Sequence, residues 1–137
     1  MRRSRRSSAW PPEFFVDRCL GKGTPARLVE LGWVVHLISN HFTDDAQNVS
    51  DPEWIQFGLS QRWSMLTQDL RIRTQPEVHR LLRAHNGTVF CLSGAELPVR
   101  VRADRFHAQQ ASIYQRVRDG KAGFFVVTES GVIRRRL

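Results

Sequence analysis

The sequence has little of the chemistry that indicates a zinc, disulfide-rich or membrane protein. Its two cysteines, Cys19 and Cys91, show neither CxxC nor Cys/His spacing, so no zinc site or disulfide framework is indicated. Both lie in or beside apolar runs, and we expect buried free thiols in a reducing compartment. No apolar run approaches the ~20 residues that cross a membrane. The basic first residues are followed by Pro11, Pro12 and Glu13 instead of an apolar segment, which favours a cytoplasmic protein over a secreted one.

Lysine is also scarce. Of the 21 basic residues, only Lys22 and Lys121 are not arginine. The formal net charge is +8, but four arginines lie among the first six residues and three more at 134–136, which leaves about one positive charge for the rest. The planar guanidinium suits phosphate, and a basic surface favours nucleic acid as a partner. Composition bias with solubilising tails explains the two ends equally well.

Length and composition are those of one globular domain. The chain has 137 residues, of which 41% are hydrophobic and 25% charged, so it can bury a core of its own. We expect residues 1–11 to form a disordered, Arg-rich arm that ends at the Pro-Pro pair. Residues 12–137 are then expected to form a single domain.

Strands and helices are predicted to alternate along this domain. Apolar runs of strand length cover residues 13–17, 33–38, 64–69, 88–92, 123–127 and 132–134. Helices are expected from 24 to 32, from 50 to about 60, from 74 to 87, and as one long helix from 99 to 118. Thr24 is the predicted N-cap of the first helix, and Ser50 and Glu53 have capping-box spacing at the second. Run 33–38 has the continuous apolar character of a buried parallel strand.

This alternation favours a three-layer α/β/α fold with a mainly parallel central sheet and a C-terminal hairpin.

Three aspartates are predicted to meet at one edge of the sheet. Asp17 and Asp69 each follow an apolar strand, and ligands bind outside the carboxyl ends of parallel strands. Asp51 opens a helix and, at ~100° per residue, falls on its sheet-facing stripe. Carboxylates held together raise one another's pKa, and a divalent cation relieves the repulsion. Oxygen ligands without His or Cys favour Mg²⁺ or Mn²⁺.

Each aspartate also has an ordinary structural explanation. Asp51 is as consistent with a helix cap as with a ligand, and Asp69 with the start of a turn. Asp17 has Arg18 and Arg27 as alternative charge partners.

Neighbouring residues are candidates for binding substrate. Thr67 lies two residues before Asp69, on the same face of the strand, where its hydroxyl can bond a carboxylate or substrate. Arg71, Arg73 and Lys22 are expected to contact substrate phosphate, with a solvated edge as the alternative for the two arginines.

The motifs around these aspartates resemble those of PIN-like nucleases. They are F-V-D-R-x-L-G over 15–21, D-x-E-W-I over 51–55 and L-T-Q-D over 66–69. The sequence is most similar to the small single-domain branch that includes the VapC-type toxins of bacterial toxin–antitoxin pairs.

The resemblance implies a Mg²⁺- or Mn²⁺-dependent endoribonuclease that leaves a 3′-hydroxyl and a 5′-phosphate. It implies that Asp17, Asp51 and Asp69 are the catalytic, metal-binding acids. Expected partners are RNA, a cognate antitoxin protein and a second copy of the chain in a homodimer. The wider family often has a fourth acid soon after the third. Here residues 70–73 are Leu-Arg-Ile-Arg, and nothing in the spacing selects Glu53, Glu96 or Asp104 instead.

Two other functions fit parts of the pattern. A non-catalytic nucleic-acid-binding protein would use the arginines and would not need the aspartates. A phospho-acceptor domain also places Asp at strand ends, but it needs a lysine at a later strand end, where neither Lys22 nor Lys121 lies.

Overall fold

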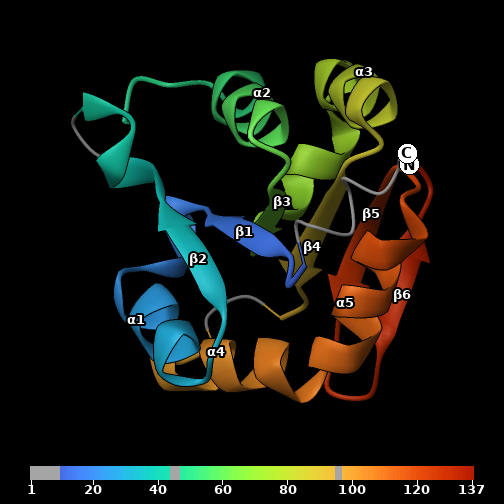
Figure 1. Ribbon diagram of the computed structural model, residues 1–137. Coiled ribbons are helices and arrows are strands. Elements are labelled where there is room, and N and C mark those ends of the chain that lie inside the picture. The colour runs from blue at the N-terminus through green and yellow to red at the C-terminus, as the bar shows by residue number, and fades with distance from the viewer. Residues whose placement is uncertain (1–9, 44–46, 95–96) are drawn as a thin grey trace.

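The computed structural model describes residues 10–43, 47–94 and 97–137, and in it a six-stranded sheet lies between two layers of helices (Figure 1). The strand order is β2-β1-β3-β4-β5-β6, and every neighbouring pair is parallel except β5 and β6. The strands are β1 (Glu13–Val16), β2 (Val34–Leu37), β3 (Ser64–Thr67), β4 (Thr88–Leu92), β5 (Gly123–Val127) and β6 (Val132–Arg135). The predicted α/β class, mainly parallel sheet and C-terminal hairpin are therefore confirmed.

Five α-helices and three short 3₁₀ helices connect the strands in the described part of the chain. The α-helices are α1 (Gly23–Glu30), α2 (Asp51–Ser60), α3 (Pro76–His85), α4 (Val99–Ala108) and α5 (Gln110–Asp119). The 3₁₀ helices are η2 (Arg18–Leu20), η3 (Ile38–Asn40) and η5 (Leu70–Thr74). No helix among the described residues combines the length and apolarity needed to span a membrane. Residues 1–9 of the expected arm, and Glu96, lie outside the described residues.

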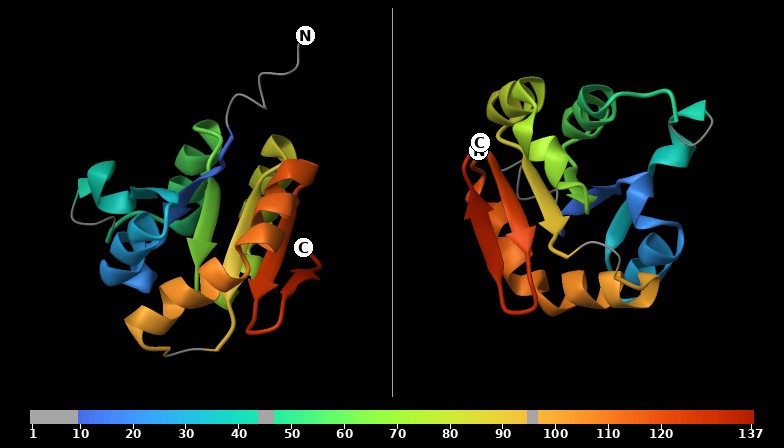
Figure 2. Two further views of the ribbon diagram at one scale, coloured as in Figure 1. Left: turned by 60° about the horizontal axis from the view of Figure 1, so that its bottom comes forward. Right: turned by 180° about the vertical axis from the view of Figure 1, so that it is seen from behind.

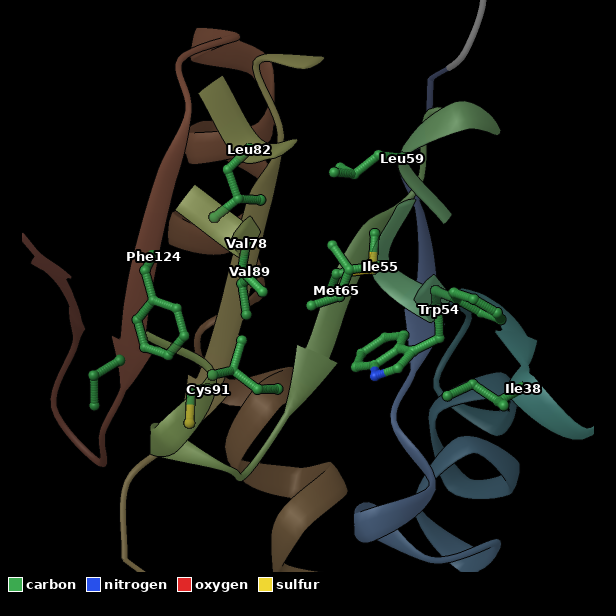
Figure 3. Packing of buried hydrophobic residues seen from close by; sticks show 13 residues of the cluster. Ile38, Trp54, Ile55, Leu59, Met65, Val78, Leu82, Val89, Cys91 and Phe124 are labelled. Carbon is green, nitrogen blue, oxygen red and sulfur yellow. The ribbon is translucent and has the colours of Figure 1, made fainter. Parts of the chain in front are cut away.

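The central strands are buried on both faces. Phe15 and Met65 point into a cluster that α2 and α3 cover, whereas Phe14 and Leu66 point into a second cluster under α1, α4 and α5. All four side chains are fully buried. Figure 2 shows the two helical layers on opposite sides of the sheet, and Figure 3 shows the packing of the first cluster. Because both faces of β1 and β3 are packed, the ends of these strands are held in fixed positions.

β2 is a parallel strand, as predicted, but it lies at an edge of the sheet and is only partly buried, so the prediction of a buried strand was wrong. β2 pairs only with β1, and Val34 remains 36% exposed. His36 is a satisfied strand residue: its Nε2 lies 2.7 Å from Glu13 Oε1, and its ring stacks on Trp63. A continuous apolar run indicates strand conformation but does not give the position of the strand in the sheet.

The long helix predicted over 99–118 is two helices. α4 ends at Ala108, and α5 begins at Gln110. Gln109 between them has φ −106° and ψ 18°, and its side chain donates a hydrogen bond to the carbonyl of Glu129. α4 packs across α1, whereas α5 turns to lie against the sheet (Figure 1). The apolar spacing continues through the break because both helices cover the same layer.

The helix ends follow the sequence signals only in part. The capping box of Ser50 and Glu53 at α2 is confirmed. Thr24 is not an N-cap: its hydroxyl donates a 2.7 Å hydrogen bond to the carbonyl of Leu20. Helix α3 ends at His85, and the left-handed residue that caps it is Asn86, one residue before Gly87, where the sequence predicted the end.

Substituting Gly58 by alanine should destabilise the fold. A Cβ at this position in α2 would lie 2.8 Å from both Met65 Cε and Phe15 Cδ2. Overpacking of this kind costs about 1–3 kcal/mol, which exceeds the gain of up to about 1 kcal/mol in helix propensity. Urea unfolding of Gly58→Ala should show the loss. The matched control is Gly131→Ala, because nothing lies within 4 Å of a Cβ there. Equal stabilities of the two variants would contradict the prediction.

Candidate acidic site at the strand ends

The candidate site lies where β1 and β3 end side by side. Val16 is in register with Leu66, and the next amide, that of Asp17, donates a 2.9 Å hydrogen bond to the carbonyl of Leu66. Thr67 is the last residue of β3, and Asp69 follows two residues later. The parallel pairing therefore brings the two strand ends to one level, as the sequence predicted.

The Asp17 carboxylate is buried and bound by uncharged groups. The Thr67 hydroxyl donates to Asp17 Oδ2 at 2.7 Å, and the Cys19 thiol donates to the same oxygen at 3.3 Å. The Cys19 amide lies 3.5 Å from Oδ1. Burial raises the pKa of Asp17; the hydrogen bonds from Thr67 and Cys19 partly offset this, and the charge of Asp51 adds to it. Within the described part of the chain, Asp17 forms no ion pair, so neither Arg18 nor Arg27 is its partner.

Asp51 opens α2 but does not cap it. Ser50 accepts from the Glu53 amide and performs that role. Both carboxylate oxygens of Asp51 are instead occupied by side chains: Trp54 Nε1 donates to Oδ1 at 2.9 Å, and Gln75 Nε2 donates to Oδ2 at 2.8 Å. Asp51 thereby connects the start of α2 to the residue that precedes α3.

Asp69 begins a turn and also forms an ion pair. The Arg71 amide donates to Asp69 Oδ1 at 3.0 Å, which starts η5. The Arg71 guanidinium approaches with two nitrogens: Nε lies 2.9 Å from Oδ1, and Nη2 lies 2.9 Å from Oδ2. The hydrogen bonds from Arg71 lower the pKa of Asp69, and burial opposes them. The Arg73 side chain has a different partner: its Nη1 donates to the carbonyl of Arg136.

The three aspartates share one region without forming a closed cluster. Asp51 is near enough to raise the pKa of Asp17, and Asp69 and, to a smaller extent, Asp51 raise the pKa of Arg71. Among the described residues, no group of three or more His, Cys, Asp or Glu side chains is arranged to hold a metal ion. The oxygen-only donor set fits Mg²⁺ or Mn²⁺ chemically. In the present arrangement Arg71 hydrogen-bonds both oxygens of Asp69 and competes with a metal ion for them. The assignment of these residues as catalytic and metal-binding stays a prediction.

The prediction for Cys19, a neighbour of the site, was wrong. Cys19 was expected to be buried, but the residue is exposed; only Cys91 is fully buried. The Cys19 thiol nevertheless points inward at Asp17 and lies 3.5 Å from the Thr67 hydroxyl. Burial of the thiol, together with the charge of Asp17, raises its pKa to about 12. The sequence signal for this contact is the position of Cys19 two residues after Asp17, which lets its amide and its thiol reach the same carboxylate.

A small hollow lies beside Asp17. It is lined by residues from the end of β1, the start of α1 and the end of β2, and Lys22 and Ser39 are among them. Lys22 is exposed at this hollow, which is compatible with its predicted contact to a substrate phosphate. Gln75 and Gln68 also belong to the surroundings of the site, and no sequence signal identified them. Gln68 Nε2 donates to the carbonyl of Cys19 at 2.9 Å, while its buried Oε1 has no hydrogen-bond partner among the described residues.

Side chains of helix α4 hold the loop that follows Asp17. Arg102 Nη1 donates to the carbonyl of Leu20 at 3.0 Å, and its Nε donates to the carbonyl of Leu97 at 2.7 Å. Val99 packs so closely on the start of α1, directly after this loop, that a Cβ at Gly23 would lie 2.6 Å from the Val99 side chain. The loop beside Asp17 is therefore held by a helix from a distant part of the sequence.

Arg102→Ala should lower the free energy of unfolding. The substitution removes a charged donor from two carbonyls in a partly buried position, a loss of about 1–3 kcal/mol. Arg100→Ala on the same helix is the matched control, because that side chain is exposed. Urea unfolding of both variants tests the prediction, and equal losses would contradict this role of Arg102.

The stability contributions of Asp17 and Asp69 should depend on pH with opposite signs. The native pKa of Asp17 is raised above 3.8, so its contribution is greatest below that pH and is lost as pH rises through the native value. The native pKa of Asp69 is lowered, so its contribution is present above 3.8 and is lost as pH falls.

Urea unfolding at a series of pH values, from about 3 to 7, compares wild type with Asp17→Asn and Asp69→Asn. The stability of wild type relative to Asp17→Asn should decrease as pH rises. Relative to Asp69→Asn it should increase. Slopes of the same sign would contradict the different environments of the two carboxylates.

The sequence comparisons agree with this geometry. The family model described as PIN like domain matches residues 12–94, which are more than half of the chain and include Asp17, Asp51 and Asp69. No curated protein and no solved structure matches the chain. The matched range covers β1 to β4 and thus both strand ends that form the site. The chain belongs to the PIN-like domain family.

Proposed function

We propose that this protein is a metal-dependent endoribonuclease that hydrolyses RNA phosphodiester bonds. The PIN-like domain is a fold typical of nucleases. The observation that carries the proposal is the Asp17 carboxylate, which is 8% exposed and has no cationic partner among the described residues. A buried carboxylate without a cation is costly when ionised, and Asp51 nearby increases that cost. A divalent cation between the two would remove it.

Asp17, Asp51 and Asp69 are the residues that would hold Mg²⁺ or Mn²⁺. When bound, such an ion lowers the pKa of water and stabilises charge on a phosphate oxygen. The protein supplies the positioning. Thr67 and the Cys19 amide orient the Asp17 carboxylate, and the packed ends of β1 and β3 keep it at the edge of the sheet.

The cationic side chains around the aspartates support an anionic, phosphate-containing substrate. Lys22 lies at the hollow beside Asp17, and Arg71 lies beside Asp69. Arg73, two residues further on, stays a predicted phosphate contact, and in the structure its Nη1 donates to the carbonyl of Arg136. Guanidinium groups bind phosphate through paired hydrogen bonds, which would orient an RNA backbone across the carboxylates.

The proposal includes the toxin role in a toxin–antitoxin pair, with an antitoxin protein as partner and a homodimer as the assembly. It rests on the motifs of the sequence. Induced expression in a bacterial host should arrest growth, and Asp17→Asn should relieve the arrest at equal protein level. Arrest by both forms would contradict the toxin role.

Asp17→Asn should reduce Mn²⁺-stimulated RNA cleavage by at least about 100-fold, because it removes one of the three charged carboxylates proposed to hold the metal. Asp69→Asn should abolish the same activity without unfolding the protein. The assay follows end-labelled RNA with and without Mn²⁺, and circular dichroism checks the fold. Asp119→Asn is the control, since Asp119 is an exposed residue at the end of α5. Unchanged cleavage by Asp17→Asn or Asp69→Asn would refute the nuclease proposal.

The second candidate is a non-catalytic nucleic-acid-binding protein. The arginine-rich composition favours it, as does the pairing of Asp69 with Arg71. In that case wild type would cleave no RNA, affinity would fall steeply with salt, and the aspartate variants would bind RNA as wild type does.

A further inference from the structure

The Arg71 guanidinium binds the Asp69 carboxylate, which is the group that a metal cation would bind. Its two nitrogens take both carboxylate oxygens at 2.9 Å each, and the Arg71 amide adds a third hydrogen bond to Oδ1. No other ion pair involving Asp17, Asp51 or Asp69 occurs in the described ranges 10–43, 47–94 and 97–137. Oδ1 thus accepts two hydrogen bonds from Arg71 and Oδ2 accepts one, so the Arg71 guanidinium competes with a metal cation for this carboxylate.

The surroundings of Arg71 also favour a reversible contact. The Arg71 side chain is 87% exposed, whereas that of Asp69 is only 21% exposed. The carboxylate is thus held by the turn, and the guanidinium reaches it from solvent. Exposed ion pairs contribute little to stability, so millimolar concentrations of a divalent cation can compete with this one. Arg71 has space to leave without disturbing the core.

We infer that Arg71 has two positions, one bound to Asp69 and one bound to a substrate phosphate, and that a divalent cation on Asp69 drives the exchange. This inference rests on the proposed function. The same planar fork that matches a carboxylate also matches a phosphate, so the released guanidinium finds an equivalent partner on the RNA. Metal binding and phosphate binding are then coupled, and each strengthens the other by the same factor.

The first test is the affinity for Mn²⁺ alone, measured by calorimetry on the full chain. Arg71→Gln removes the competitor and should bind Mn²⁺ about threefold to tenfold more tightly than wild type, as expected for an exposed pair. Arg73→Gln removes an equal charge two residues away, where the guanidinium bonds a carbonyl, and should stay within about twofold of wild type. Arg71→Lys keeps the charge but loses the paired hydrogen bonds, so it should also bind more tightly than wild type.

Two results would overturn the inference. One is equal affinity of wild type and Arg71→Gln. The other is tighter binding by Arg71→Gln with Arg71→Lys identical to wild type, which would mean that net charge alone acts. Thermal unfolding of each variant verifies the fold, and Arg71 is exposed enough that its substitution should leave it intact.

The second test is the effect of Mn²⁺ on the binding of a fluorescent single-stranded DNA oligonucleotide, checked by gel to be uncleaved. In wild type, Mn²⁺ should increase the affinity. In Arg71→Gln the ratio of the DNA affinities with and without Mn²⁺ should be smaller than in wild type by about threefold or more, although the variant binds Mn²⁺ more tightly. Arg73→Gln should bind the DNA more weakly with and without Mn²⁺ and keep the full increase. An unchanged increase in Arg71→Gln would refute the exchange of partners.

The two tests separate this inference from the proposed function. If neither wild type nor Arg71→Gln binds Mn²⁺, the metal site itself is refuted and the inference with it. If both bind Mn²⁺ with one affinity and Asp17→Asn does not bind it, the metal site stands and only the role of Arg71 is refuted.

Discussion

The buried hydrogen bond from the Thr67 hydroxyl to the Asp17 carboxylate orients the most buried acid of the site. At 2.7 Å it joins the ends of two neighbouring parallel strands, one step beyond the last backbone bond between them. A buried carboxylate is tolerated only when polar groups surround it, and Thr67 supplies the shortest of its contacts. The strand pairing alone brings the two residues together, because β1 and β3 are packed on both faces and cannot slide.

The three aspartates differ in how the protein stabilises their negative charge. Asp17 has a hydroxyl, a thiol and an amide, and Asp51 has two neutral N–H donors; within the described part of the chain, only Asp69 has a cation. The carboxylates of Asp17 and Asp51 are therefore stabilised by neutral dipoles and not by a positive charge. Such carboxylates attract cations. This imbalance makes Arg71 part of the site and not a separate surface ion pair.

The family match ends at residue 94, yet the site depends on residues beyond that point. Helix α4 supplies Arg102 and Val99, which hold the loop after Asp17, and β5 covers the outer edge of β4. The C-terminal part also contains the break at Gln109, which lets one helix cross α1 and the next lie against the sheet. The segment that carries the aspartates is thus supported by one that carries none of them.

The amino-acid sequence alone was enough to predict the α/β class, most of the strands, the capping box at Ser50 and the placement of Asp17 and Asp69 at strand ends. These depend on apolar periods and caps, which act over a few neighbouring residues. The packed structure was needed to show that β2 lies at an edge, that Thr24 donates to Leu20 and that Arg71 holds Asp69. Strand order and side-chain partners depend on which surfaces meet when the layers pack. These contacts join residues that are far apart in the sequence, and the local pattern of residues does not encode them.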